Sequence, residues 1–320
     1  MRPDNRPEIS VVVAVYNEAD NVRPLVARIA EALNDFDYEL IYVDDGSTDG
    51  TLDVLKSIDD KRLKIIELRK NYGQSLALMA GIDQAAGEFI VTLDGDLQND
   101  PFDIPMMLDL AKKGDWDLVA GIRANRQDDV LLRKIPSRIA NWIIRKLSGV
   151  HMKDYGCALK VFRAEIAKGM GLYGELHRFI PVLAYLEGAR ITQVNVRHHP
   201  RVAGQSKYGL GRTFKVVSDL LLMLFFKKYM QRPMHLFGIW GIVLFTIGVL
   251  INLYLGALKL MGQDIWGKPL LILALMLVVA GIQLVTFGIM VEIQMRTYFE
   301  SQDKRPYRIR RIWQKGEENS

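Results

Sequence analysis

The sequence has little of the chemistry that cross-links secreted proteins or binds transition metals. Cys157 is the one cysteine among 320 residues, which excludes an intrachain disulfide and fits a reducing compartment. The histidines form no cluster, and we assign His198 and His199 to the end of a strand rather than to a metal site. No Gly-x-Gly-x-x-Gly follows the first predicted strand and no Walker loop occurs, which disfavours dinucleotide dehydrogenases and P-loop ATPases.

Internal repeats and low-complexity segments are also lacking. Residues 1–8 are polar and the apolar run after them is short, so no signal peptide is expected. The formal net charge is +5, but the basic residues gather beside two long apolar runs. Anionic lipid headgroups explain that placement better than nucleic acid, and no nucleic-acid partner is expected.

The two apolar runs lie in the last third of the chain. Residues 236–258 and residues 269–291 contain no charged side chain, and residues 259–268 separate them. As a helix, each run would be roughly 34 Å long at about 1.5 Å per residue, enough to cross a hydrocarbon core of about 30 Å. Two buried core helices would not need this length, so we predict a transmembrane hairpin.

The charges beside the hairpin predict its orientation. The charged residues of the short connecting segment are Lys259, Asp264 and Lys268. Basic residues on the other side of the two runs are Lys227, Lys228, Arg232, Arg296, Lys304, Arg305, Arg308, Arg310, Arg311 and Lys315. By the positive-inside rule, the N-terminal region and the tail face the cytoplasm of a multi-pass inner-membrane protein.

The first 120 residues alternate between strand-like and helix-like periodicity. Apolar runs predict strands at residues 9–15, 38–43, 63–68, 88–93 and 117–120, and the segments between them predict helices at 20–33, 51–58 and 73–86. Strands that are apolar on both faces and alternate with helices are typical of an open, mostly parallel α/β sheet.

Polar side chains follow three of these strands, in residues 16–18, 44–47 and 94–98. Open α/β sheets bind ligands beyond the carboxyl ends of their strands. An isolated Asp-x-Asp pair would most often cap a turn, but Asp94 and Asp96 share this edge with other acids and amides. Because Mg²⁺ and Mn²⁺ bind one or two carboxylates plus substrate phosphates, the pair predicts a cation that bridges a diphosphate.

Several motifs resemble the signatures of glycosyltransferase family 2. They are residues 13–18 (VAVYNE), 43–49 (VDDGSTD), 69–74 (RKNYGQ) and 94–98 (DGDLQ). Within the family the chain is similar to the polyprenyl-phosphate glycosyltransferases, through residues 123–128 (RANRQD), 154–157 (DYGC), 179–181 (FIP) and 204–208 (GQSKY). It resembles the 4-deoxy-4-formamido-L-arabinose transferases most, then the dolichol-phosphate mannose synthases. The likeness runs from about residue 9 through the tail and implies a GT-A fold.

The resemblance implies roles for individual residues. Asp94, Asp96 and Gln98 would hold Mg²⁺ or Mn²⁺. The expected catalytic residues are Asp94, Asp96 and Arg123, and Arg123 would contact the donor or acceptor phosphates. Residues expected to bind the donor nucleotide sugar are Ala14, Tyr16, Glu18, Val43, Asp45, Gly73, Gln74, Gly95, Arg201 and Lys207. Residues expected to bind the lipid phosphate are Arg126, Arg133 and Ser137.

Two of these assignments have alternatives. Arg201 and Lys207 lie in a basic stretch rich in small residues, which either closes over a diphosphate or remains a solvated loop beside the membrane. Arg133 and Ser137 are four residues apart and share a helix face, which suits either a phosphate monoester or lipid headgroups. Some relatives carry an Asp, proposed as a base, at the position of Cys157, so this departure weakens any expectation of a protein base there.

We therefore expect a cytoplasmic GT-A catalytic domain (1–212), an interfacial amphipathic helix (213–232), two transmembrane helices (233–295) and a basic cytoplasmic tail (296–320). The expected reaction is inverting, metal-dependent transfer from a nucleotide sugar, most simply a UDP-sugar, to undecaprenyl or another polyprenyl phosphate. Such a product would serve envelope glycan or lipopolysaccharide modification, and relatives form homotetramers. Alternatives are a GDP-mannose-dependent synthase, a processive polysaccharide synthase, and a non-catalytic nucleotide-binding membrane scaffold.

Overall fold

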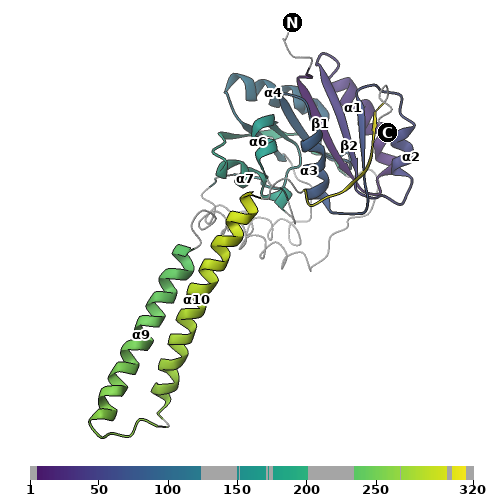
Figure 1. The fold of residues 1–320 in the computed structure, drawn as a ribbon. Helices are drawn as coiled ribbons and strands as arrows, with labels where there is room; N and C mark the ends of the chain where they lie inside the picture. Colours follow the sequence, from purple (N-terminus) through teal and green to yellow (C-terminus); the bar gives the residue numbers. More distant parts are fainter. Residues whose placement is uncertain are drawn as a thin grey trace. The chain divides into compact units, whose positions relative to one another are not determined.

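The computed structural model describes residues 6–123, 150, 152–170, 172, 176–200, 234–266, 268–300 and 305–314. The chain forms two compact units. The first comprises Met1–Leu220 with Pro306–Ser320, and the second comprises Leu221–Arg305. Figure 1 shows a sheet with helices on both faces in the first unit and a pair of long helices in the second.

The first unit is built on an eight-stranded sheet in the order β7-β5-β6-β4-β1-β2-β3-β8. Its strands are β1 (Ile9–Val15), β2 (Tyr38–Asp44), β3 (Leu63–Leu68), β4 (Phe89–Asp94), β5 (Leu118–Arg123), β6 (Lys160–Arg163), β7 (Ile191–Val196) and β8 (Ile309–Gln314). Strands β6 and β8 pair antiparallel to their neighbours, and every other pairing is parallel. The carboxyl ends of β1 to β5 therefore lie along one edge of the sheet.

Helices cover both faces of this sheet (Figure 1). One face packs against α1 (Ala19–Ala32), α2 (Thr51–Lys56) and α4 (Ile104–Lys113), and the other against α3 (Gln74–Gln84), α6 (Ala164–Gly169) and α7 (Ile180–Leu186). In β1, Val11 and Val13 lie in the core with Leu25 of α1, whereas Val12 lies in the core with α3. Burial of alternate residues on opposite faces explains why β1 is a continuous apolar run.

The predicted strands at the start of the chain and the helices between them are confirmed, with small shifts at their ends. The structure adds β6, β7 and β8. From the sequence, residues 296–320 are expected to form a basic tail, but α10 (Pro269–Glu300) extends into this range and residues 309–314 form β8, antiparallel to β3. Tyr307 Oη donates to Asp83 Oδ2 at 2.6 Å, and Arg310 pairs with Glu67 at 3.1 Å. These contacts secure a strand that covers an otherwise open sheet edge.

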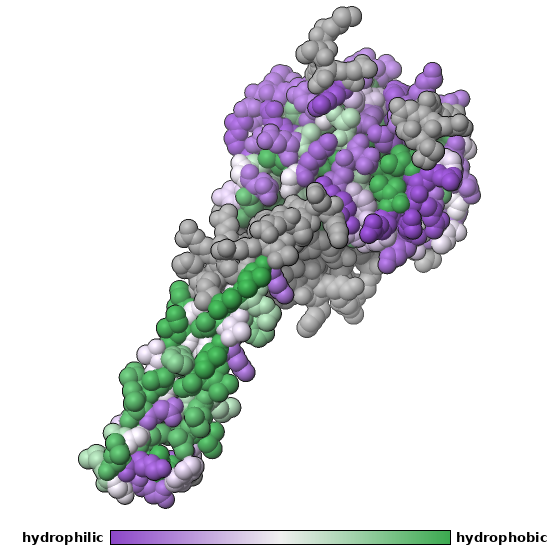
Figure 2. All heavy atoms as spheres, in the orientation of Figure 1, coloured by the Kyte–Doolittle hydropathy of each residue, from purple (hydrophilic) through white to green (hydrophobic). Residues whose placement is uncertain are grey.

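The second unit contains α9 (Met234–Leu260) and α10, which pack against each other as a hairpin. Phe237–Leu260 and Pro269–Val291 are long and apolar enough to cross a membrane. Large apolar side chains such as Trp240, Leu253 and Phe287 are exposed on this hairpin, and Figure 2 shows its surface to be mainly hydrophobic. The apolar helical hairpin is thus confirmed, whereas its orientation stays a prediction. The expected interfacial helix at residues 213–232 lies outside the described residues.

Candidate active site

The strand register brings predicted site residues from three strands side by side. Ala14 of β1 stands opposite Val43 of β2 on one side and opposite Asp94 of β4 on the other. Gly95 follows Asp94 directly and packs against the end of β1, since a Cβ atom there would lie 2.6 Å from Val15 Cγ1. The polar residues that follow these strands therefore meet at the carboxyl edge of the sheet, as parallel pairing requires.

Asp94 and Asp96 occupy the turn that follows β4. Asp94 is half-buried, and its Oδ1 accepts a 2.7 Å hydrogen bond from Gln74 Nε2 at the start of α3. Asp96 is buried, and its Oδ1 accepts from the backbone N–H of Gln98 at 3.2 Å. Leu97, which lies between Asp96 and Gln98, has φ of +61°, an uncommon conformation for a non-glycine residue. The turn thus presents two carboxylates and the Gln98 side chain from one short segment.

Asp94, Asp96 and Gln98 suit a hard divalent cation, but they supply only part of its coordination shell. Among the described residues, no group of three or more His, Cys, Asp and Glu side chains is arranged to hold a metal. Two carboxylates with an amide oxygen offer only oxygen ligands, which suit Mg²⁺ or Mn²⁺ rather than softer metals. Water and phosphate oxygens would have to complete the coordination shell.

Asp45 has a positioning role in this structure. Its carboxylate accepts hydrogen bonds from the backbone N–H groups of Tyr72 (2.7 Å) and Gly73 (2.9 Å), which open α3. Burial raises the pKa of Asp45, and these two hydrogen bonds oppose the rise. The neighbouring Gly46 has φ of +72°, and a Cβ atom there would lie 2.8 Å from Asn71 N, so glycine is required at this close approach. Asp45 thereby fixes the place of Gly73 and Gln74.

Tyr16 and Glu18 lie on the loop that follows β1, and both are half-buried. The loop is fastened to residues that sequence reasoning did not assign to the site: Asn17 N donates to Ser47 Oγ at 2.9 Å and Thr48 N donates to Asn17 Oδ1 at 2.8 Å. Glu18 N also donates to Thr51 Oγ1 at 2.9 Å. The motif that contains Asn17 and the motif that contains Ser47 to Asp49 therefore brace each other. The motifs themselves were visible in the sequence, but their contact was not.

Arg123 ends β5 and forms a two-pronged ion pair with Asp154. Arg123 Nε lies 2.7 Å from Asp154 Oδ2, and Nη2 lies 2.9 Å from Oδ1. Burial would raise the pKa of Asp154, but the hydrogen bonds and the positive charge of Arg123 hold it below its ordinary value. The pair fixes the plane of the guanidinium, so Asp154 is a positioning residue for Arg123. A bidentate pair of this kind also leaves N–H groups of Arg123 for other acceptors.

Cys157 and Lys160 lie next to this ion pair. Cys157 is 1% exposed, and burial raises the pKa of its thiol, so the thiol is protonated at neutral pH and unsuited to act as a base. Lys160, the first residue of β6, is 3% exposed and donates to the backbone carbonyl of Cys157. Sequence reasoning gave Lys160 no role, because burial of a lysine cannot be seen in the residue type.

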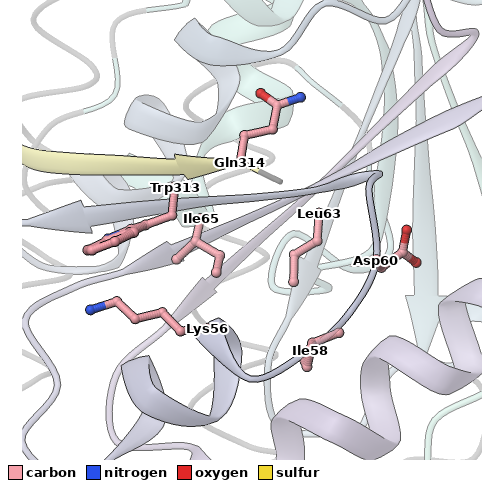
Figure 3. A pocket seen from close by; sticks show the side chains of 7 residues that line it. All are labelled: Lys56, Ile58, Asp60, Leu63, Ile65, Trp313 and Gln314. Atoms are coloured by element: carbon pink, nitrogen blue, oxygen red, sulfur yellow. The ribbon is translucent and has the colours of Figure 1, made fainter. Parts of the chain in front are cut away.

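Five predicted site residues lie outside the described residues, namely Arg126, Arg133, Ser137, Arg201 and Lys207. A pocket of about 240 Å³ elsewhere in the first unit does not coincide with the predicted site. It lies beside the start of β3 and the end of β8, where Lys56 Nζ stands 4.1 Å from the ring centroid of Trp313 (Figure 3). Its lining includes none of the predicted donor, metal or acceptor residues.

The first unit has a GT-A-like α/β fold. The solved structure of glucosyl-3-phosphoglycerate synthase from Mycobacterium tuberculosis in complex with UDP matches with a TM-score of 0.54 and 18% identity. The match covers 68% of this chain and 80% of that chain. A complex of the same enzyme with Mn²⁺, UDP and glucosyl-3-phosphoglycerate matches with a TM-score of 0.53 and 17% identity over 69% of this chain and 80% of that one.

Sequence comparisons identify the family. Residues 10–168 match the model of glycosyl transferase family 2. The dodecaprenyl-phosphate galacturonate synthase of Rhizobium johnstonii is 45% identical over 314 residues, covering 96% of this chain and 93% of that protein. The undecaprenyl-phosphate 4-deoxy-4-formamido-L-arabinose transferase of Yersinia pestis is 35% identical over 312 residues, covering 95% and 93%. The chain belongs to glycosyl transferase family 2 and is a glycosyltransferase.

Proposed function

We propose that this enzyme transfers a glycosyl group from a UDP-sugar to polyprenyl phosphate, with inversion and with Mg²⁺ or Mn²⁺ bound. The product would be a polyprenyl-phosphate sugar used to modify the cell envelope. The observation that carries the proposal is the 45% identity with the dodecaprenyl-phosphate galacturonate synthase. Because that likeness covers 96% of this chain, it includes the apolar helices as well as the sheet.

The carboxyl edge of the sheet would hold the donor. Ala14, Tyr16, Glu18, Val43 and Asp45 would surround the nucleotide. Asp94, Asp96 and Gln98 would bind the cation, which when present neutralises the diphosphate as it leaves. The Mn²⁺ and UDP in the M. tuberculosis enzyme named above support this assignment by analogy of fold. The hydrogen bond from Gln74 would keep Asp94 oriented toward the cation.

The lipid phosphate can act as nucleophile without a protein base. A phosphate monoester has a second pKa near ~6, so it is mostly dianionic at neutral pH. One of its oxygens would attack the anomeric carbon as the bond from that carbon to the UDP oxygen breaks, which inverts the configuration. The buried, protonated thiol of Cys157 supports a mechanism without a base at that position. Arg123, held by Asp154, would align a phosphate and stabilise its charge.

The sugar is expected to be a uronic acid. The named relatives act on galacturonate and on 4-deoxy-4-formamido-L-arabinose, and this chain is 45% identical to the first and 35% identical to the second. A donor screen tests this directly. Purified enzyme is incubated with polyprenyl phosphate and with UDP-galacturonate, UDP-glucose or the formamido-arabinose donor. Mass spectrometry then identifies and quantifies the lipid products. UDP-galacturonate should be used fastest, and a clear preference for UDP-glucose would contradict the choice of sugar.

The choice of nucleotide has a separate test. A pocket built for a pyrimidine leaves buried polar groups unpaired when the larger purine enters, at a cost of about 1–3 kcal/mol per group. UDP should therefore bind roughly ten- to a hundredfold more tightly than GDP, because about 1.4 kcal/mol corresponds to a factor of ten. Isothermal titration of both nucleotides with Mn²⁺ measures the ratio. Equal affinity, or a preference for GDP, would return the chain to the mannose-synthase alternative.

A further inference from the structure

A buried lysine lies at the edge of the sheet where the donor would bind. Lys160 begins β6, which runs antiparallel to β4, and it pairs with Thr92 of β4 and Ala120 of β5. Thr92 is two residues before Asp94, and Ala120 is three before Arg123. Lys160 thus lies between the strand that ends in the carboxylate turn and the strand that ends in Arg123. It is 3% exposed, so it is not a surface charge.

One hydrogen bond and its strand neighbours place Lys160 beside the site. Its Nζ donates to the backbone carbonyl of Cys157, in the segment that also contains Asp154. Burial lowers the pKa of Lys160, and Cys157, Asp94 and Asp154 oppose that change. In its protonated form, Lys160 is attracted by Asp94 and Asp154 and repelled by Arg123. A buried ammonium is costly to retain, since an apolar side chain of similar length would fill the same space without desolvation.

We propose that Lys160 is a positioning residue of the donor site, whose buried ammonium offsets the charge of Asp94 and whose hydrogen bond fixes the Cys157 carbonyl. The inference rests on the proposed function, because it concerns the nucleotide and cation of that site. Arg123 is already paired with Asp154, so without Lys160 the charge of Asp94 and Asp96 would favour a divalent metal and oppose a diphosphate. Lys160 sets the balance so that both can enter.

The proposal predicts changes of opposite sign when the charge is removed. Without Lys160 the site is more negative, so Mn²⁺ alone should bind more tightly. UDP alone, in the presence of EDTA, should bind more weakly. Each affinity should change by about three- to tenfold, because a neighbouring unit charge in a partly buried site acts strongly on an ion. A variant that merely disturbs the fold would weaken both affinities together.

The test uses the full-length protein in detergent and three variants of this residue. Lys160→Gln removes the charge but can still donate to the Cys157 carbonyl, Lys160→Met removes both, and Lys160→Arg keeps the charge. Lys64→Gln is the matched control. Lys64 lies near the start of β3, away from the carboxyl edge of the sheet, and pairs with Glu39 at 3.5 Å. Electron paramagnetic resonance measures Mn²⁺ binding, and calorimetry measures UDP binding in EDTA.

In Lys160→Gln and in Lys160→Met, Mn²⁺ should bind more tightly and UDP more weakly than in the wild type. Lys160→Arg and Lys64→Gln should have the affinities of the wild type. Unchanged affinities in Lys160→Gln, or a parallel fall in both, would overturn the proposal. If Lys160→Met does not fold, the comparison of Lys160→Gln with Lys160→Arg still decides the question. Failure of the wild type to bind UDP with Mn²⁺ would instead reject the proposed function.

Discussion

At the scale of single residues, Asp94 and Asp96 differ in their surroundings although they are two positions apart. Asp94 is half-buried and bonded to the side chain of Gln74, whereas Asp96 is buried and bonded to the backbone of its own turn. A change at Asp96 therefore leaves the contact between β4 and α3 intact. Asp96 is the better position at which to remove charge while keeping the shape of the site.

Asp96→Asn should abolish glycosyl transfer and weaken UDP binding in Mn²⁺ by at least tenfold, since the cation would lose a charged ligand. Calorimetry and a transfer assay measure the two effects. Asp109→Asn is the control, because Asp109 is an exposed acid on α4 that pairs with Lys113 at 2.8 Å, away from the predicted site. Near wild-type turnover in Asp96→Asn would show that the Asp-x-Asp turn does not hold the cation.

Asp154→Asn should destabilise the first unit at neutral pH, because it leaves Arg123 without its carboxylate partner. A loss of about 2 kcal/mol is expected for a partly buried ion pair, or roughly 4–8 °C in melting temperature. The pKa of Asp154 is lowered in the fold, so its contribution is present above the unfolded pKa of about 3.9 and is lost as pH falls through the folded value. The melting difference between variant and wild type should therefore shrink between pH 5 and roughly pH 2. A difference that stayed constant with pH would contradict this account.

The sequence predicted which residue types gather at the site but not how they contact one another. The ends of β1, β2 and β4 were identifiable because apolar runs stop there and polar motifs begin. The prediction that Asp45 binds the nucleotide did not include the hydrogen bonds that its carboxylate accepts from the Tyr72 and Gly73 backbone. The pairing of Arg123 with Asp154 joins residues 31 positions apart, and no local pattern encodes it.

At the scale of elements, the parallel strands were predictable and the antiparallel ones were not. Each of β1 to β4 is a mainly apolar segment, which is typical of a buried parallel strand, although β2 contains Glu39 and β3 contains Lys64 and Glu67. By contrast, β8 reads Ile-Arg-Arg-Ile-Trp-Gln, and its arginines fit a membrane flank equally well. It pairs with β3, more than 200 residues earlier in the chain. Only the fold shows that these residues form a sheet edge.

The two apolar helices approach closely at glycine. A Cβ atom on Gly281 of α10 would lie 2.6 Å from Phe245 N and 2.7 Å from Gly241 O of α9. Small residues at such positions let helix backbones pack closely in membranes. The hairpin therefore depends on the absence of a side chain at this crossing.

Gly281→Ala should force the helices apart and lower the melting temperature in detergent by several degrees, for a cost of about 1–3 kcal/mol. Gly256→Ala is a matched control on α9, since nothing lies within 4 Å of a Cβ atom built there. The control should be neutral or slightly stabilising, because alanine favours helix more than glycine does. Equal melting temperatures for the two variants would show that the crossing at Gly281 is not tight in solution.

At the scale of the whole molecule, the charges beside the apolar helices predict how the protein is oriented in the membrane. The flanking charges predict that Asp264 and Trp266 face the periplasm and that Arg310 and Cys157 face the cytoplasm. Because Cys157 is 1% exposed, it should give little background in a labelling experiment. An impermeant maleimide applied to intact cells should label Asp264→Cys but not Arg310→Cys. Labelling of Arg310→Cys before the cells are permeabilised would reverse the predicted orientation.

We expect this glycosyltransferase to join one sugar to a lipid phosphate. The most direct measurement is mass spectrometry of the organic extract after full-length enzyme is incubated with a UDP-sugar, Mn²⁺ and either polyprenyl phosphate or the corresponding polyprenol. With polyprenyl phosphate we expect one new lipid, a polyprenyl phosphate bearing a single sugar, and with polyprenol we expect none. A sugar polymer, an equal yield from polyprenol, or release of UDP with no glycolipid would contradict it.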